Sequence, residues 1–346
     1  MSAERIPVSV LTGFLGSGKT TILRHLAQQG ELDRTLILVN EFGEVGLDHQ
    51  LLTPIDDDTL VAVESGCICC TIRADLVKTL TDAPWRYARG GKRWFDRVII
   101  ETTGIADPAP ILQTILGNES VSAQYDLAAV ITAVDAVNGF ASLHNHLEAV
   151  KQVAVADRLL LTKTDLAGDD VVKLDRRLRE LAPSAEQNQV LHGEAQAGWF
   201  FDVGSFKLDG KAAKVDDWLR EEMLAAQHAD RHTHDHPADP NRHGQIFASC
   251  LTFSEPVDAA MFEASLSLLL QFKGPDLLRI KGIVNVHGVD RPMVIHGVQH
   301  VFHPPQILDD WPSEDRRTRI VIIAKDLDHE QIGDCFRGFG FSPEGT

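Results

Sequence analysis

The sequence contains no apolar run that approaches the ~20 residues a helix needs to cross a bilayer, so we expect no membrane-spanning segment. Its first residues, MSAERIPVSVLTGF, lack the basic start and the small-residue cleavage site of a signal peptide. Five cysteines in 346 residues are too few for a disulfide framework, and three of them lie within four positions. These absences together predict a protein of the reducing cytoplasm.

Positive charge is also scarce, because 33 lysines and arginines face 50 aspartates and glutamates, a formal net charge of −17 at pH 7. Such a surface repels phosphodiester backbones and anionic lipid, so we expect neither nucleic acid nor a membrane as a partner. A hydrophobic content of 44% with 24% charged residues is typical of a soluble globular protein and argues against wholesale disorder. At roughly 100–200 residues per domain, the length predicts about two domains.

The first two-thirds of the chain alternates apolar runs with helical patterns, which predicts a doubly wound α/β domain over residues 1–225. The apolar runs are continuous, as in strands that are buried on both faces of a mainly parallel sheet. We expect strands at Ile6–Thr12, Thr35–Asn40, Leu60–Glu64, Arg97–Glu101, Leu127–Val134, Arg158–Thr162 and Asn188–His192. We expect helices at Lys19–Gln28, Ile111–Leu116 and Asp169–Leu181, among others.

A different pattern follows residues 227–243, QHADRHTHDHPADPNRH, which lack hydrophobic periodicity and predict an exposed linker over 226–243. From 244 to 341 we expect a smaller α+β domain, and the alternation from Ile280 to Val286 predicts a sheet with one solvated face. The expected strands are Gln245–Phe253, Leu278–Val286, Pro292–Phe302 and Thr318–Lys325. The expected helices are Asp258–Leu270 and Leu327–Phe336.

One motif carries phosphate chemistry. The segment GFLGSGKT at Gly13–Thr20 fits G-x-x-x-x-G-K-[ST], follows an expected strand and opens an expected helix, which is the context a P-loop requires. Its glycines let backbone N–H groups turn toward phosphates, while Lys19 reaches the β/γ-phosphates and the Thr20 hydroxyl coordinates Mg²⁺. A glycine-rich turn that matches by chance is the alternative, which this context disfavours. The predicted cradle residues are Gly13, Gly16, Ser17, Gly18, Lys19 and Thr20.

Two later strands end in residues that would complete a nucleotide site. The strand Arg97–Glu101 ends in a carboxylate that can hold the Mg²⁺ hydration shell, with Gly104 beyond it for close approach to the γ-phosphate. The strand in LLLTKTD ends in a T-K-x-D that is similar to the guanine-reading N-K-x-D of GTPases. An aspartate there accepts two guanine N–H groups, whereas adenine would leave a buried carboxylate unpaired. We therefore predict GTP over ATP, although a surface turn is the alternative; the guanine contacts are Thr162, Lys163 and Asp165.

A metal site with soft ligands is expected at GCICC. In an extended segment, Cys67 and Cys69 project to one side and Cys70 to the other. One thiolate pair with a carboxylate or histidine suits Zn²⁺ or Cu⁺, while buried structural cysteines and a redox pair are the alternatives. Cys250 and Cys335, each alone on an apolar element, are expected in the core.

Two further segments are candidates for metal binding. NEFGEVGLDH at Asn40–His49 leaves a strand end where a nucleotide-sensing switch loop belongs. Its acids can bind the transition metal, bind Mg²⁺ or be solvated; they are Glu41, Glu44 and Asp48. The linker histidines form either a loose imidazole metal site or a solvated loop; they are His228, His232, His234, His236 and His243.

The motifs GFLGSGKTT, NEFGEVGLD, GCICC, ETTGIADP and TKTD, in this order, resemble the CobW family of P-loop GTPases. The later HGVQHVF and WPSEDRRTRIVII resemble that family's C-terminal domain, so the resemblance spans nearly the whole chain. It implies a P-loop NTPase fold and slow Mg²⁺-dependent GTP hydrolysis coupled to the handling of a transition metal, usually zinc and in some branches cobalt.

The same resemblance assigns roles to single residues. Thr21 joins the phosphate cradle, Glu101 becomes the carboxylate on the Mg²⁺ side, and Asp48 is a further Mg²⁺ candidate. The implied transition-metal ligands are Cys67, Cys69 and Cys70, with Glu44 as a helper. Val39 stands where similar sequences often carry a glutamate, which places more weight on the thiolates.

The first hypothesis is a GTPase metallochaperone that delivers zinc or cobalt to an apo-metalloprotein, with Lys19, Thr20 and Glu101 as catalytic residues. A metal-storing or metal-sensing module that binds GTP without coupled delivery is the rival, and a P-loop kinase or ATPase is the third hypothesis, which Asp165 disfavours. A second copy of the chain is a further predicted partner. No glutamine lies just beyond Gly104, so the sequence identifies no residue that positions the attacking water.

Overall fold

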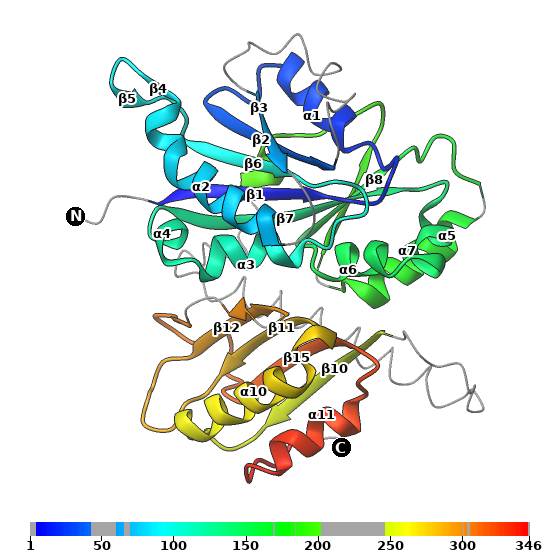
Figure 1. Cartoon of the computed structure of the whole chain (residues 1–346). Coiled ribbons are helices and arrows are strands. Elements are labelled where there is room, and N and C mark those ends of the chain that lie inside the picture. Colours follow the sequence, from blue (N-terminus) through cyan, green and yellow to red (C-terminus); the bar gives the residue numbers. More distant parts are fainter. Residues whose placement is uncertain are drawn as a thin grey trace. The chain divides into compact units, whose positions relative to one another are not determined.

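The computed structural model describes residues 5–42, 60–65, 70–168, 170–183, 185–201, 246–299, 301–302 and 305–344. At residues 40–42, 60–65, 70–73 and 170 the description covers the backbone alone. The chain divides into two compact units, one built on each of two large sheets, and each is described by itself (Figure 1). In the described part of the chain, no helix combines the length and the apolar character needed to cross a membrane.

The first unit contains a seven-stranded sheet with the order β3-β2-β6-β1-β7-β8-β9, in which every neighbouring pair is parallel. Its strands are β1 (Ile6–Thr12), β2 (Thr35–Phe42), β3 (Leu60–Ser65), β6 (Arg97–Glu101), β7 (Tyr125–Asp135), β8 (Arg158–Thr162) and β9 (Glu186–Val190). A separate two-stranded hairpin consists of β4 (Ala88–Arg89) and β5 (Lys92–Arg93). The predicted parallel α/β domain is confirmed.

Helices flank this sheet (Figure 1). They are α1 (Lys19–Gln28), α2 (Cys70–Arg86), α3 (Ala109–Gly117), α4 (Glu119–Ser122), α5 (Gly139–Asn145), α6 (Leu147–Ala154), α7 (Asp170–Leu181) and α8 (Gly198–Phe201). On one face, Ile22 and Leu26 of α1 and Phe200 of α8 pack with strand residues such as Leu11 and Ile99 in one fully buried cluster. Because alternate strand positions point to the opposite face and are buried too, the strands read as continuous apolar runs.

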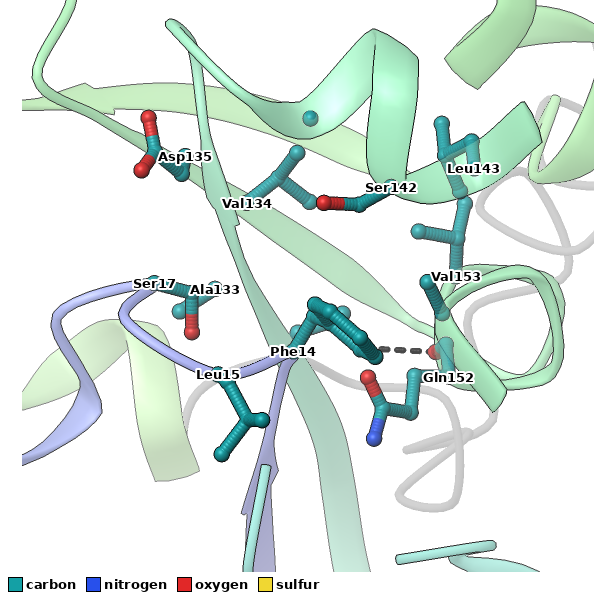
Figure 2. A pocket seen from close by; sticks show the side chains of 13 residues that line it. Phe14, Leu15, Ser17, Ala133, Val134, Asp135, Ser142, Leu143, Gln152 and Val153 are labelled. Carbon is teal, nitrogen blue, oxygen red and sulfur yellow. Dashed lines mark hydrogen bonds between the residues drawn. The ribbon is translucent and has the colours of Figure 1, made fainter. Parts of the chain in front are cut away.

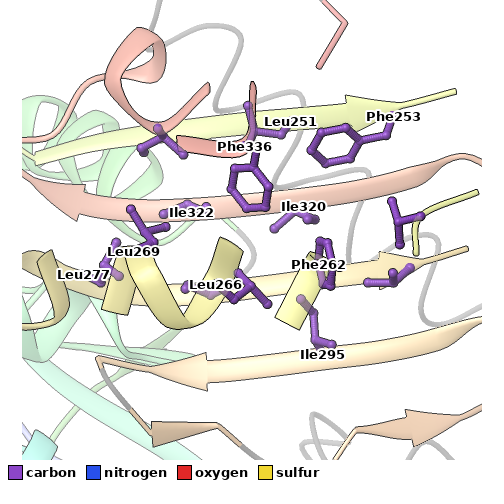
Figure 3. Packing of buried hydrophobic residues seen from close by; sticks show 14 of the residues in the cluster. Leu251, Phe253, Phe262, Leu266, Leu269, Leu277, Ile295, Ile320, Ile322 and Phe336 are labelled. Carbon is purple, nitrogen blue, oxygen red and sulfur yellow. The ribbon is translucent and has the colours of Figure 1, made fainter. Parts of the chain in front are cut away.

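The second unit is an antiparallel sheet with the order β10-β15-β11-β12-β13, and β14 pairs with β12. Its strands are β10 (Ile246–Phe253), β11 (Leu277–Val284), β12 (Met293–Val298), β13 (Val301–Phe302), β14 (Gln306–Ile307) and β15 (Thr318–Lys325). Its helices are α10 (Ala259–Lys273), the 3₁₀-helix η2 (Gly274–Asp276) and α11 (His329–Arg337). Phe262 and Leu266 of α10 and Phe336 of α11 pack on one face of this sheet (Figure 3).

The expected solvated face of this sheet is wrong for its central strands. Every residue of β11 is buried, so the alternation of apolar and polar residues along this strand does not correspond to alternating buried and exposed side chains. A second apolar cluster of Ile283, Val294, Leu308 and Val321 lies outside the main core cluster and includes a residue from the segment after β14. Polar residues on these strands are buried as well, and they include Arg279 and Lys281.

Three smaller expectations also change. The strand predicted at Asn188–His192 lies two residues earlier, and the strand predicted at Pro292–Phe302 breaks at Gln299, whose φ of 52° is left-handed. Helix α2 was not predicted. Cys250 and Cys335 lie on β10 and α11 as expected, but both are half-buried at the edges of apolar clusters.

Candidate functional site

The loop between β1 and α1 has the backbone shape of a phosphate cradle. Gly13 has a φ of 141°, and a Cβ there would lie 2.3 Å from the carbonyl oxygen of Ala133, so a side chain is excluded. Gly18 is the N-cap of α1 with a φ of 89°, and no side chain caps the helix. The first N–H groups of α1 are therefore available to an anion, which the helix dipole also favours.

Lys19 lies within this loop although it carries a charge. Its side chain is buried, and its Nζ donates to the carbonyl oxygen of Gly13 at 2.8 Å and to that of Phe14 at 3.4 Å. These two bonds hold the ammonium group on the inner side of the curved loop. A phosphate in the loop would meet this charge together with the backbone N–H groups.

Thr20 and Glu101, which are 81 positions apart, meet beside the loop. The Thr20 hydroxyl donates to Oε1 of Glu101 at 2.9 Å, and the carboxylate lies buried at the end of β6. A hydroxyl and a carboxylate are hard oxygen donors of the kind that Mg²⁺ prefers. The donor set therefore fits the magnesium ion that P-loop chemistry uses, in agreement with the predicted pairing of these two residues.

The segment after Glu101 packs directly on the loop. A Cβ on Gly104 would lie 2.7 Å from the backbone nitrogen and Cα of Leu15, so no side chain fits between the two segments. Gln152 on α6 holds this segment, because its Nε2 donates to the carbonyl oxygens of Gly104 at 3.2 Å and Ala106 at 2.9 Å. The neighbouring Lys151 pairs with Asp107 at 2.7 Å. The sequence analysis missed this anchor, since a glutamine in a short helix gives no signal of burial.

A small cavity lies between the loop and helices α5 and α6 (Figure 2). Its volume is about 20 Å³, room for about one water molecule, and its lining includes Phe14, Ser17 and Gln152. Within the described residues, Ser17 Oγ and Gln152 Oε1 are both buried without a hydrogen-bond partner. The back of the loop is therefore not fully packed, and two unpaired oxygen atoms belong to residues of a mostly apolar lining.

Thr162 joins the end of β8 to the same loop. Its hydroxyl donates to the carbonyl oxygen of Ser17 at 2.9 Å and is 3.3 Å from that of Val134. A Cβ on Gly18 would come within 3.5 Å of the Thr162 methyl group. The T-K-x-D turn thus borders the phosphate cradle, as the order of the motifs predicted.

Lys163 pairs with a carboxylate that the sequence analysis did not identify. Its Nζ lies 2.8 Å from Oδ2 of Asp135, the last residue of β7, and its φ of 57° is left-handed. Burial acts to raise the pKa of Asp135, but bonds from Lys163, Asn138 and the Val137 N–H outweigh it and hold that pKa below its ordinary value. Asp135 is therefore an ionised anchor for the turn. A polar residue at a strand end, the signal that identified Glu101, could have found it.

Asp165 follows two residues later and is exposed. We expected a buried carboxylate at this position, but Asp165 lies at the surface of the turn. Within this turn, the Leu166 N–H donates to the Lys163 carbonyl oxygen at 3.1 Å. The Thr21 side chain, at the start of α1, is exposed as well.

Most of the predicted metal ligands, for the transition metal or for Mg²⁺, lie outside the described residues. These are Glu44, Asp48, Cys67, Cys69 and the five linker histidines. The backbone of Cys70 is described, and it begins helix α2, so the extended conformation predicted through this residue is wrong at that position. Among the residues with described side chains, no three His, Cys, Asp or Glu residues cluster closely enough to hold a metal ion.

Family models match both units. The nucleotide-binding domain model of CobW/HypB/UreG matches residues 7–189, and the C-terminal domain model of the cobalamin synthesis protein cobW matches residues 246–339. The chain is 33% identical over 334 residues to the zinc chaperone YjiA of Escherichia coli (strain K12), covering 96% of this chain and 98% of YjiA. It is 30% identical over 357 residues to the zinc chaperone CobW of Pseudomonas aeruginosa, covering 96% of this chain and 91% of that one.

Solved structures agree with these matches. The Zn(II)-bound YjiA GTPase from E. coli aligns with a TM-score of 0.67 and 29% identity, over 97% of this chain and 99% of that one. A Zn(II)-bound YjiA triple mutant, with one glutamate and two cysteines changed to alanine, aligns with a TM-score of 0.69 and 29% identity. With a P-loop domain followed by the matching C-terminal domain, the chain belongs to the CobW family of nucleotide-binding GTPases.

Proposed function

We propose that this protein hydrolyses GTP slowly to GDP and phosphate, with Mg²⁺, and uses the nucleotide cycle to deliver zinc to an apo-metalloprotein in the reducing cytoplasm. One observation carries the proposal: Lys19, the Thr20–Glu101 pair and Thr162 converge on one glycine loop from three different strand ends. The relatives that cover nearly the whole chain are named zinc chaperones, which supports zinc as the cargo.

Each residue has a proposed role in this function. Lys19, Thr20 and Glu101 are the catalytic residues that bind the phosphates and Mg²⁺, and Thr162, Lys163 and Asp165 form the guanine site. The rest of the proposed phosphate cradle is Gly13, Gly16, Ser17, Gly18 and Thr21. The proposed metal ligands are Cys67, Cys69 and Cys70, with Glu44 as a helper and Asp48 as a Mg²⁺ candidate.

The proposed domain boundaries are 1–225 for the GTPase domain, 226–243 for the histidine-rich linker and 244–341 for the C-terminal domain. The extents of the two family models, 7–189 and 246–339, support this division. Cobalt is the alternative cargo, and a second copy of the chain is a further proposed partner.

Metal-dependent GTP turnover tests the function. The purified protein is stripped of metal, supplied with Mg²⁺, and assayed for phosphate release with and without zinc, cobalt or nickel. Delivery coupled to hydrolysis predicts that the cargo metal changes turnover. If turnover is the same with and without each metal, the result would favour the rival function, a GTP-binding module that stores or senses metal.

A second experiment locates the metal. The Zn(II)-bound YjiA structure that lacks one glutamate and two cysteines shows that zinc can be found in a relative without those side chains, so the site needs a direct test. Zinc titration compares the wild type, a Cys67→Ser/Cys69→Ser/Cys70→Ser variant and a deletion of residues 227–243. Loss of the tightest zinc in the triple variant supports the thiolate site, because a hydroxyl is a much poorer ligand for Zn²⁺ than a thiolate. Loss in the deletion alone would move the site to the linker histidines.

A further inference from the structure

Positive charge gathers in one segment of this acidic chain. Residues 85–97, WRYARGGKRWFDR, contain five basic residues and one acidic residue, although the whole chain has a net charge of −17. The same segment contains three of the chain's seven tryptophans and tyrosines. Arginine and large aromatic residues together are the composition of residues that dominate binding at protein interfaces.

The segment folds into a hairpin with a defined shape. Strands β4 and β5 pair in antiparallel register, and the turn between them is Gly90-Gly91, with φ values of 59° and 75°. Two left-handed residues in a two-residue turn match the type I′ geometry of tight hairpins. The hairpin follows α2 and precedes β6, so both of its ends are fixed by elements of the first unit (Figure 1).

Lys92 and Arg93 supply exposed positive charge on the hairpin. Arg89 lies over the Trp94 ring at 4.7 Å and Arg93 over the Phe95 ring at 5.8 Å, which orients both guanidinium groups. Lys92 and Arg93 are exposed and form no ion pair with any residue that the structure describes. Trp85, at the end of α2, is 82% exposed.

A hollow of about 570 Å³ lies beside this hairpin. The hairpin contributes Arg89, Lys92 and Arg93 to its lining, and Trp94 adds an aromatic wall. Arg34, just before β2, also lines the hollow, but Asp96 neutralises it through a bidentate pair that lowers the pKa of Asp96. Asp33 adds one exposed carboxylate to the lining, against the three basic residues of the hairpin. The charge that can attract a ligand is therefore concentrated on the hairpin.

We propose that the β4–β5 hairpin and its hollow are a docking surface for an acidic segment of a partner protein. The positive charge of the hairpin favours an acidic ligand. The net negative charge of the rest of the chain repels such a ligand if it is long enough to reach beyond the hairpin. A long nucleic acid would extend beyond the hollow along a chain whose net charge is −17 and would be repelled, whereas a short acidic peptide would contact the hairpin alone. The exposed Trp85 and half-buried Trp94 offer the apolar contact that a protein segment can use.

The docking surface is separate from the phosphate cradle. It lies at the edge of the sheet where β2 and β6 begin, whereas the cradle lies where the strands end, roughly 16 Å away along the five residues of β6. Helix α2 begins at Cys70 and ends at the hairpin, about 25 Å further along its axis. The partner's identity as a metal client rests on the proposed function, but the binding of an acidic segment does not.

Anisotropy of a labelled peptide of about ten glutamates tests the proposal, without nucleotide or added metal. Lys92→Glu/Arg93→Glu should weaken binding about 10-fold or more, and binding by the wild type should fall as NaCl rises. The matched control is Arg176→Glu/Arg316→Glu, which makes the same charge change at two other exposed arginines. Its binding should stay close to the wild type.

Three outcomes would overturn the proposal: equal losses in the hairpin and control variants, no peptide binding by the wild type, or tighter hairpin-dependent binding of single-stranded DNA of similar length. GTP binding is measured for every variant and should be unchanged, which checks the fold and keeps this result apart from the proposed GTPase function. If charge reversal disturbs folding, Lys92→Ala/Arg93→Ala replaces it and should show a smaller loss in the same direction.

Discussion

At the edge of the parallel sheet where its strands end, the protein itself holds the lysines near the P-loop. Lys19 donates to the Gly13 carbonyl oxygen, and Lys163 pairs with Asp135. At the opposite edge, the hairpin cations are exposed, with Lys92 and Arg93 free of ion pairs in the described structure. Charge that is held in place by bonds within the protein suits a small ligand that enters a fixed cradle, whereas exposed charge without ion pairs suits a large partner. The two edges should therefore respond to different substitutions.

Among the substitutions that separate the two edges, Lys19→Ala should have the largest effect, and this effect should be on GTP turnover. Loss of the ammonium removes the buried charge that meets the β/γ-phosphates, and we expect GTP turnover to fall by about 10²–10³-fold. Acidic-peptide binding at the hairpin should not change. Phosphate release measures the first effect, and near-normal turnover would remove the P-loop assignment.

Asp165→Asn tests the edge of the sheet that carries the P-loop more finely, because it changes recognition of the base without changing the phosphate cradle. An amide offers one acceptor and one donor group in place of two acceptor oxygens. Each hydrogen bond to a charged partner contributes about 1.5–3 kcal/mol, so the GTP/ATP selectivity should fall ~10- to 100-fold. Competition binding of the two nucleotides measures the ratio, and an unchanged ratio contradicts the guanine site.

Gln152→Leu tests whether α6 positions the segment that carries Gly104. The variant loses the bonds to the Gly104 and Ala106 carbonyl oxygens, and we expect turnover to fall about 10-fold with a smaller change in GTP affinity. The matched control is Gln124→Leu, since Gln124 also donates to a backbone carbonyl oxygen, that of Ser120, but lies before β7 begins. Equal losses of turnover and affinity, or equal effects in the control, would reduce Gln152 to a packing residue.

Asp135→Asn should have the smallest effect, and it depends on pH. The pKa of Asp135 lies below its ordinary value of 3.8, so its stabilising contribution is present above that value and is lost as pH falls through the lower folded pKa. We expect the variant's unfolding free energy to be lower by about 1–2 kcal/mol at neutral pH and to converge with that of the wild type as pH falls through the lowered folded pKa. Urea unfolding across this range measures both, and a constant difference would contradict the role given to the Lys163 pair.

The sequence predicted the first sheet well because its strands are buried on both faces. Ile6–Thr12, Arg97–Glu101 and Arg158–Thr162 have the predicted bounds, and the P-loop, Glu101 and Thr162 meet as expected. In parallel sheets the strand ends share one edge, so motifs at successive strand ends must come together.

Other features depend on tertiary contacts that no local pattern encodes. The alternation along β11 predicted a solvated face, but that strand is buried at every position. Gln152 is fully buried because α6 packs against the Gly104 segment, and its sequence neighbours do not show this. Helix α2 contains Pro84 near its C-terminal end and was missed for lack of a clear apolar stripe.

Zinc affinity measured with GDP and with a non-hydrolysable GTP analogue tests the proposed coupling most directly. If nucleotide state controls the metal ligands, the two affinities of the wild type should differ about 10-fold or more, and zinc should shift the nucleotide affinities by the same factor. The difference should disappear in the Cys67→Ser/Cys69→Ser/Cys70→Ser variant. Equal zinc affinity in both nucleotide states would contradict the account, because a nucleotide without differential effect on the metal site cannot drive its delivery.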